Sequence, residues 1–395
     1  MKRSVNNLLL IIFLMFWSNA ALSHAEPTKD RYVSNAGEDI GRCDNVLRPC
    51  KTILYAARHA NKGDKVLVEA GHYTLSEASE VFYLTSNLVP VLGGYDRFDH
   101  FQNQAPQINI TTLSGIPQSY KKQIIANGFS VINDGKAMNS GKLKKMQQAF
   151  NQLSNKQSNQ PCNNNNAGGF PCSNINLISH MPLSSFESSP DRASDIWGHV
   201  DLNTGKEYAI IGLSEAISVV DVSIPAEPKE VGSIAGDKST WRDIKVHQYF
   251  EKNENRWKAY AYASADRTED RIVIIDLNDL SNGITLVSQS GPVSAHNVHI
   301  SGVDYTLGVQ TGNTIPTLQL LGANEKNGAV LNYKLSNQHS PEISDFINTG
   351  VGYSHDSATM ELDGNQKDNI CGPVADSCQV ILDFNEKEVQ FWNSS

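Results

Sequence analysis

A tetrapeptide of two apolar residues, Asp or Asn, and a third apolar residue occurs four times in this 395-residue chain: Val219-Val220-Asp221-Val222, Ile274-Ile275-Asp276-Leu277, Val330-Leu331-Asn332-Tyr333 and Ile381-Leu382-Asp383-Phe384. The polar positions are 55, 56 and 51 residues apart. A regular period of this order indicates a solenoid or a propeller. Short alternating strands between Gly, Asn and Pro turns favour four-stranded propeller blades. Residues 161–395 are therefore predicted to form a β-propeller of about four blades, either a small closed ring or an incomplete one.

A second, polar motif lies upstream of each of these strands and makes chance recurrence a poor explanation. It occurs as Trp197-Gly198-His199-Val200-Asp201, Trp241-Arg242-Asp243-Ile244-Lys245, His296-Asn297-Val298-His299 and His355-Asp356-Ser357. Aligned on these motifs, His199, Asp243, Asn297 and Asp356 take equivalent places. The motifs are predicted to be the innermost strands, which line the channel of a propeller.

Side chains of these motifs are the candidate site residues. His199, Asp243, His296, His355 and Asp356 would converge near one axis, and imidazoles with carboxylates suit a divalent metal or a polar ligand. The favoured alternative is that they form hydrogen bonds between blades, because buried polar groups need partners. Trp197 and Trp241 are candidate sugar platforms, with packing between blades as the more common use. Asp221, Asp276 and Asp383 are expected to cap turns.

The N-terminus has the layout of a secretory signal peptide over residues 1–25. Met1-Lys2-Arg3 precedes an apolar run from Leu8 to Trp17, and small residues precede Glu26. The run is shorter than the roughly 20 apolar residues that span a bilayer. We therefore expect a soluble mature chain without a transmembrane segment, secreted or at the cell surface, with the periplasm as the other exported location.

Charge argues against two classes of partner. Without Lys2 and Arg3 the chain keeps 31 basic and 42 acidic residues, a net charge of −11. An acidic surface of this size disfavours nucleic acid and anionic membranes. An extracellular protein or glycan is the expected partner.

Six cysteines form three close pairs in the sequence: Cys43 with Cys50, Cys162 with Cys172, and Cys371 with Cys378. An even number behind a signal peptide predicts disulfides, and the short spacing favours closure within each pair. Zinc would favour spacings of two to four residues, which these pairs exceed.

Residues 28–136 are predicted to form a separate β-rich domain. A strand at Arg31–Ser34, an amphipathic helix within 51–60 and a strand around Val66 and Val68 lead to a turn at Gly71. This opening resembles that of pectin-lyase-like right-handed β-helices, and the resemblance implies a short, truncated β-helix that binds or caps. Residues 137–160 are predicted to be a helical linker, since Leu143, Met146, Phe150 and Leu153 form one apolar stripe.

From Cys162 onward the chain resembles the choice-of-anchor B family of secreted bacterial proteins with LVIVD-type propeller repeats. The resemblance rests on the polar motifs above, on Phe170-Pro171-Cys172-Ser173-Asn174, on Glu207-Tyr208-Ala209-Ile210-Ile211-Gly212-Leu213 and on Tyr353-Ser354-His355-Asp356. It implies a surface or secreted propeller without established catalytic residues. Family members continue through further blades to a variable C-terminal anchor, whereas this sequence ends after the fourth Asp-type strand.

Two functions follow for this all-β chain. The first is a non-catalytic binding or scaffold protein that uses propeller loops to bind a protein or glycan. The alternative is a metal-dependent extracellular hydrolase or lyase with its site at the propeller channel. The sequence contains no nucleophile elbow, phosphate loop or HExxH helix.

Overall fold

A computed structural model describes residues 29–60, 64–75, 78–85, 89–116, 118–132, 148, 154–312, 314–347, 353–362, 364–373, 378–385 and 387–393. Two predicted segments lie mainly outside these residues: the signal peptide at 1–25 and the helical linker at 137–160. The end of the linker region is a strand, β7 (Gln157–Gln160), which pairs antiparallel with β10 (Leu177–His180). The architecture confirms the predicted all-β class, with a β-helix-like N-terminal unit and propeller-like sheets after it.

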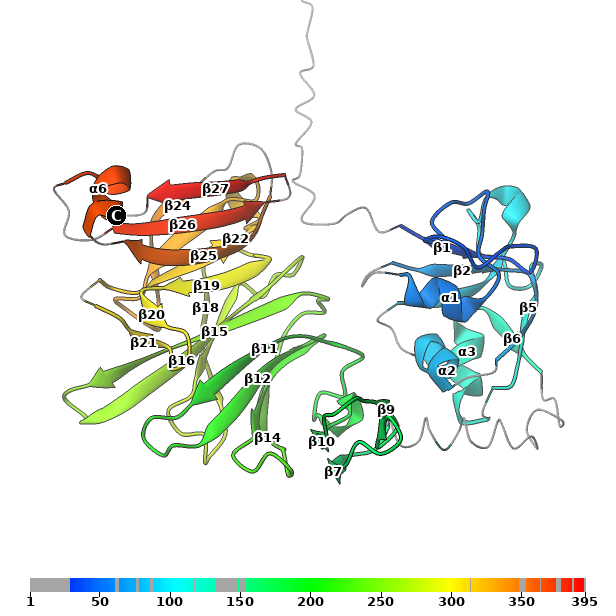
Figure 1. The fold of residues 1–395 in the computed structure, drawn as a ribbon, viewed down its shortest axis with the longest axis horizontal. Coiled ribbons are helices and arrows are strands. Elements are labelled where there is room, and N and C mark those ends of the chain that lie inside the picture. The colour runs from blue at the N-terminus through cyan, green and yellow to red at the C-terminus, as the bar shows by residue number, and fades with distance from the viewer. Residues whose placement is uncertain are drawn as a thin grey trace, which may run out of the picture.

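The N-terminal unit stacks parallel strands, as a β-helix does. One sheet has the order β1 (Arg31–Val33), β2 (Val66–Glu69), β4 (Val91–Tyr95), and the other β3 (Gly71–Thr74), β5 (Thr111–Ser114), β6 (Phe129–Val131). The helices α1 (Ile53–Arg58), α2 (Ala78–Thr85) and α3 (Lys121–Ala126) accompany them (Figure 1). Inward residues such as Val33, Val66, Leu113 and Phe129 are buried in one core. Gly71, the predicted turn, lies at the corner and begins β3.

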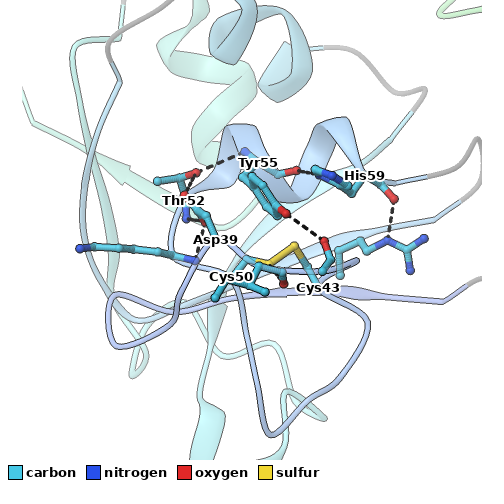
Figure 2. The surroundings of a disulfide bond; sticks show 10 residues. Asp39, Cys43, Cys50, Thr52, Tyr55 and His59 are labelled. Atoms are coloured by element: carbon cyan, nitrogen blue, oxygen red, sulfur yellow. Dashed lines mark hydrogen bonds between the residues drawn. A yellow bond between two sulfur atoms is a disulfide. The ribbon is translucent and has the colours of Figure 1, made fainter.

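All three predicted disulfides form within their pairs: Cys43–Cys50, Cys162–Cys172 and Cys371–Cys378. Figure 2 shows the first, which closes the loop between β1 and α1. Asp39 fixes the start of α1, because its carboxylate accepts hydrogen bonds from the backbone of Lys51 and from the backbone and hydroxyl of Thr52. The Tyr55 hydroxyl donates back to the Gly41 carbonyl. The disulfide and these hydrogen bonds therefore hold the loop between β1 and α1 against the start of α1.

Four consecutive sheets follow in the part of the C-terminal half that the structure describes, and all are antiparallel except for the parallel pairing of β15 with β21 in the second. The first contains β11 (Ala193–Val200), β12 (Glu207–Leu213), β13 (Ala216–Asp221) and β14 (Lys229–Ala235). The second contains β15 (Arg242–Glu251), β16 (Arg256–Ala265), β17 (Ile272–Asp276) and β18 (Thr285–Ser290), extended by β21 (Val309–Gln310) and β20 (Val303–Asp304).

The third sheet contains β19 (Asn297–Ser301), β22 (Thr317–Leu321), β23 (Val330–Lys334) and β24 (Glu342–Ile347). The fourth contains β25 (Ser354–Leu362), β26 (Cys378–Asn385) and β27 (Val389–Asn393), with α6 (Gly364–Cys371) between the first two. The smaller hairpin β8 (Asn166–Ala167) and β9 (Phe170–Pro171) belongs to the loop closed by Cys162–Cys172.

The polar motifs are the innermost strands, as predicted. Figure 1 shows them in succession, and β11 contacts β15, β15 contacts β19, and β19 contacts β25. The sheets form an open arc rather than a closed ring.

Apolar residues join the first three sheets. Ile210 and Val219 of the first sheet share a buried cluster with Ala261 and Ile275 of the second. On its opposite face the second sheet buries a different set, which includes Ile274, against Leu318, Leu320 and Leu331 of the third. Strand alternation explains this arrangement, since successive side chains point to opposite faces of a sheet.

The tetrapeptide repeat occupies the third strand of the first three sheets but the second strand of the fourth. The carboxylates of Asp221 and Asp276 accept hydrogen bonds from the backbone N–H groups of Ser223 and Asn278, which confirms the predicted turn caps. Asp383 differs, because it is buried within β26, where it accepts hydrogen bonds from the side chains of Ser354 and Asn385. The sequence pattern is therefore not structurally equivalent in the fourth sheet.

Among the described residues, none of the helices has the length and apolar character that crossing a membrane requires.

Candidate functional site

The inner strands are joined by a row of carboxylates that differs from the predicted alignment. Asp195 Oδ2 accepts a hydrogen bond from the Ile244 backbone of the next sheet, at 3.1 Å. Asp243 Oδ2 likewise accepts a hydrogen bond from the Val298 backbone N–H of the third sheet, at 2.8 Å. Asp195, not His199, is therefore the residue equivalent to Asp243. Alignment of Trp197 with Trp241 placed His199 opposite Asp243, four residues away from the true equivalent. Alignment of the dipeptides Asp195-Ile196 and Asp243-Ile244 agrees with the hydrogen bonds.

The same row continues into the third and fourth sheets. Asp243 Oδ1 accepts from the N–H of the next residue, at 2.9 Å, and Asp356 Oδ1 does so from Ser357, at 2.7 Å. Asn297 begins β19 between them. The row of Asp195, Asp243, Asn297 and Asp356 thus marks one level of the arc, and at the first two positions it bridges neighbouring sheets.

Asp195 and Asp243 form a carboxyl pair at the contact between the first two sheets. Burial, the hydrogen bond that it shares with Asp243 and the charge of Asp243 together raise the pKa of Asp195 to about 7. Lys245 Nζ lies 2.8 Å from Asp243 Oδ1 and partly offsets this repulsion. A carboxyl group that titrates near neutral pH is suited to proton transfer or to pH-dependent binding.

Two residues further along each inner strand lies a second set, Trp197, Lys245 and His299, here called the inner-strand row. Lys245 Nζ lies 4.4 Å from the centroid of the Trp197 ring, within the range of a cation–π contact. His299 is buried, and its Nε2 lies 2.7 Å from the Tyr305 hydroxyl and 3.1 Å from Thr359 Oγ1. Burial and then the charge of Lys245 lower the pKa of His299 to about 4. The row joins the first sheet to the second through Trp197 and Lys245, and the third sheet to the fourth through His299 and Thr359.

His199 is buried in β11, with 4% of its surface exposed, and its ring stacks near Tyr208. Neither ring nitrogen has a hydrogen-bond partner among the residues that the structure describes. Burial lowers the pKa of His199 to about 4. The imidazole is therefore neutral at physiological pH.

Three other predicted site residues, Trp241, His296 and His355, are gathered where the inner strands begin. The His296 and His355 ring centroids are 4.6 Å apart, and His296 lies 6.0 Å from the Trp241 ring. His296 Nδ1 lies 3.4 Å from Asp266 Oδ2, and the Tyr353 ring is also close. This group combines imidazoles, a buried carboxylate and two aromatic rings, which suit a polar ligand.

The five predicted metal ligands do not form one group. His296 and His355 lie together, whereas Asp243 is committed to Val298 and Lys245, and His199 packs on Tyr208. Among the described residues, no three His, Cys, Asp or Glu side chains are placed to hold a metal ion. Divalent-metal binding by these residues stays a prediction.

Sequence reasoning missed Asp195, Lys245, Asp266 and Tyr353. The repeated Asp-Ile dipeptides at 195–196 and 243–244 could have identified Asp195. Asp266 and Tyr353 lie outside the aligned motifs, so only the fold places them beside His296.

No protein-family model and no curated protein matches the chain. Among solved structures, the endo-arabinase from Bacteroides thetaiotaomicron is similar over 54% of this chain and 76% of its own, with 13% identity and a TM-score of 0.32. A protein from Lactobacillus plantarum is similar over 51% of this chain and 55% of its own, with 10% identity and a TM-score of 0.29. At these values neither similarity bears on function, which is inferred below from the residues of the site.

Proposed function

We propose that this chain is an exported, non-catalytic binding or scaffold protein that takes an extracellular protein or glycan on its propeller-like arc. One observation carries the proposal: Asp195, Asp243 and Lys245 of the inner strands are already paired with one another or with backbone groups of the next sheet. Asp195 and Asp243 each hold a neighbouring strand, and Lys245 is held by Asp243 and Trp197.

Catalysis of hydrolysis or elimination needs a base or acid within hydrogen-bond reach of the substrate. Moving Asp195 or Asp243 to a substrate would break the bonds that join consecutive sheets. Binding requires no such movement. Trp197 and Trp241 are half-buried, so each keeps part of its ring for a sugar or a peptide side chain.

Export and family membership are part of this proposal. Three local disulfides suit an oxidising compartment, and an open arc of four sheets suits the choice-of-anchor B repeats that the sequence resembles. The same features support a location outside the cytoplasm, secreted or at the cell surface.

The test measures binding and turnover on the same ligands. The purified mature chain is applied to a panel of extracellular polysaccharides and matrix proteins, with calcium, magnesium or zinc, and with a chelator. We expect binding that survives the chelator, with no change in ligand length. Metal-dependent cleavage that is lost in His296→Ala and His355→Ala would overturn the proposal in favour of the hydrolase or lyase.

A further inference from the structure

The contact between the third and fourth sheets contains a cleft of about 340 Å³. Its wall belongs to β22, β23 and β24 on one side and to the ends of β25 and β26 on the other. The polar side chains that matter here are Gln319, Asn332, Lys334, Ser344, Asp345 and Glu361. The inner-strand row and the His296 group do not line this cleft.

Strand register explains why these side chains face the cleft together. Gln319 pairs with Asn332, and Asn332 pairs with Asp345, so the three lie side by side across the third sheet. Directly paired residues project from the same face of a sheet. Their neighbours Leu318, Leu320 and Leu331 project from the opposite face, into the apolar contact with the second sheet.

Two of these polar side chains are buried with hydrogen-bonding capacity unused. Gln319 is 0% exposed and Asn332 is 3% exposed. Within the described part of the chain, Gln319 Nε2 and Asn332 Oδ1 have no hydrogen-bond partner. Gln319 Oε1 accepts from Ser357 Oγ at 3.4 Å, and Asn332 Nδ2 donates to Asp345 Oδ1 at 2.5 Å. An unpaired donor and an unpaired acceptor, each costing about 1–3 kcal/mol, therefore belong to two buried side chains that line one cleft.

We propose that this cleft binds a neutral sugar residue. A sugar hydroxyl both donates and accepts, as the unused pair Gln319 Nε2 and Asn332 Oδ1 requires. The carboxylates of Asp345 and Glu361 accept further hydroxyl protons, while Lys334 balances part of their charge and Ile315 supplies an apolar wall. The volume lies within the range of ligand pockets, and it equals that of about ten waters, more than one structural water needs.

This inference rests on the proposed binding function and assigns it a place and a chemical class. It also names the residue that makes the cleft. In the first two sheets, the repeat positions Asp221 and Asp276 pair with Tyr208 and Tyr260, whose buried rings fill the contact with the next sheet. In the third sheet, Asn332 pairs with Gln319 instead. A shorter, polar side chain at this position leaves the hollow.

The experiment titrates the mature chain with the methyl glycosides of glucose, galactose, mannose and arabinose, by calorimetry. We expect one of them to bind with a Kd on the order of 1 mM. Gln319→Leu should weaken it about tenfold, because one hydrogen bond to the ligand is lost. The same variant should melt close to the parent chain, since it removes the unpaired Nε2 but also the hydrogen bond from Ser357 Oγ to Gln319 Oε1.

The matched control is Ser264→Ala, which also removes a buried hydroxyl without a partner among the described residues, but in the second sheet. It should leave glycoside affinity unchanged. Independently of any variant, the bound glycoside should slow amide exchange in β22, β23 and the end of β25. Absence of binding by all four glycosides, equal affinity in Gln319→Leu, or bound glycoside without this protection would overturn the inference.

The inference and the proposed function fail in different ways. A polysaccharide or protein ligand that binds Gln319→Leu as well as the parent leaves the proposed function standing and overturns the cleft. If a glycoside binds in the cleft but none of the polysaccharides or proteins on the panel binds the chain, the sugar site is supported and the proposed function is contradicted.

Discussion

The contact between the second and third sheets and the contact between the third and fourth are built from opposite faces of the same strands. On one face of β22 and β23, Leu318, Leu320 and Leu331 pack against Ile274 and its neighbours. On the other face, Gln319 and Asn332 line a polar cleft next to the buried side chains of Leu321 and Val330. Burial of apolar surface contributes roughly 25 cal/mol per Å², whereas a paired polar contact contributes about 1 kcal/mol net. The arc is therefore expected to be firmly joined through its third sheet and more loosely joined to its fourth.

The largest effect is expected from truncating the apolar contact. Leu331→Ala removes a fully buried side chain between the second and third sheets and should cost about 2–5 kcal/mol of unfolding free energy. The adjacent residue gives the matched control: Asn332→Ala loses one hydrogen bond but also removes an unpaired oxygen, and should change stability by less than about 1 kcal/mol. Urea unfolding measures both, and equal losses would mean that the two contacts do not differ.

The disulfide Cys371–Cys378 joins the end of α6 to the start of β26, the central strand of the fourth sheet. Replacing both cysteines with serine should cost about 2–3 kcal/mol, through the entropy of the opened loop. Because the fourth sheet is loosely joined, we expect this loss as a separate early transition. Limited proteolysis would detect it as cleavage within β25–β27 alone. A single transition shifted as a whole would show that the fourth sheet unfolds with the others.

Acidification should weaken the contact between the third and fourth sheets through His299. The His299 ring contacts Tyr305 and Thr359, and the charge of Lys245 in β15 acts on it. Its pKa is about 4 in the folded chain against an ordinary 6.5, so the unfolded chain takes up the proton first. Stability from this group is full above pH 6.5 and is lost as the pH falls from 6.5 toward 4, by about 3 kcal/mol.

The variant His299→Gln should reduce the dependence of the unfolding free energy on pH between 6.5 and 4. The comparison variant is His199→Gln, because the pKa of His199 is also about 4 but His199 lies in the first sheet. Asp195 acts in the opposite direction. Its pKa is raised to about 7, so folding gains stability from it as the pH falls from 7 toward 3.8. An unchanged pH profile in His299→Gln would contradict the placement of this imidazole.

The smallest effect is expected from filling the cleft. Gln319→Tyr restores the aromatic residue of the equivalent positions in the first two sheets, and should raise stability by about 1 kcal/mol. It should also abolish glycoside binding. Destabilisation would mean that the cleft cannot accept the ring and that the equivalence with Tyr208 and Tyr260 fails.

The repeat period was sufficient to predict the all-β class and the inner strands, and the close spacing of the cysteines was sufficient to predict the three disulfides. Repeated polar motifs and close cysteine pairs are local signals, so they survive without knowledge of the fold. The register of His199 was wrong because tryptophan, not the bridging aspartate, was used to align the motifs. The role of Asp383 was wrong because the same four-residue pattern falls in a different strand of the fourth sheet.

The cleft could not be predicted, although its signal is present. Gln319 is one polar residue in an otherwise apolar stretch, Leu318 to Leu321, and nothing local shows that it replaces a tyrosine. Recognition required the strand pairing that sets Gln319 beside Asn332 as Tyr260 is set beside Asp276. Grouping of Asp266 and Tyr353 with His296 likewise depends on contacts between distant segments.

Native-state hydrogen exchange tests the central contrast most directly. Amides of β16, β17, β22 and β23 lie in sheets joined by apolar contacts and should exchange only through the highest-energy openings. Those of β25, β26 and β27 should exchange through a separate opening of clearly lower free energy. If all four sheets exchange through one opening with a single free energy, the polar contact holds the fourth sheet as firmly as the apolar contacts hold the others, which would contradict the looser attachment of the fourth sheet.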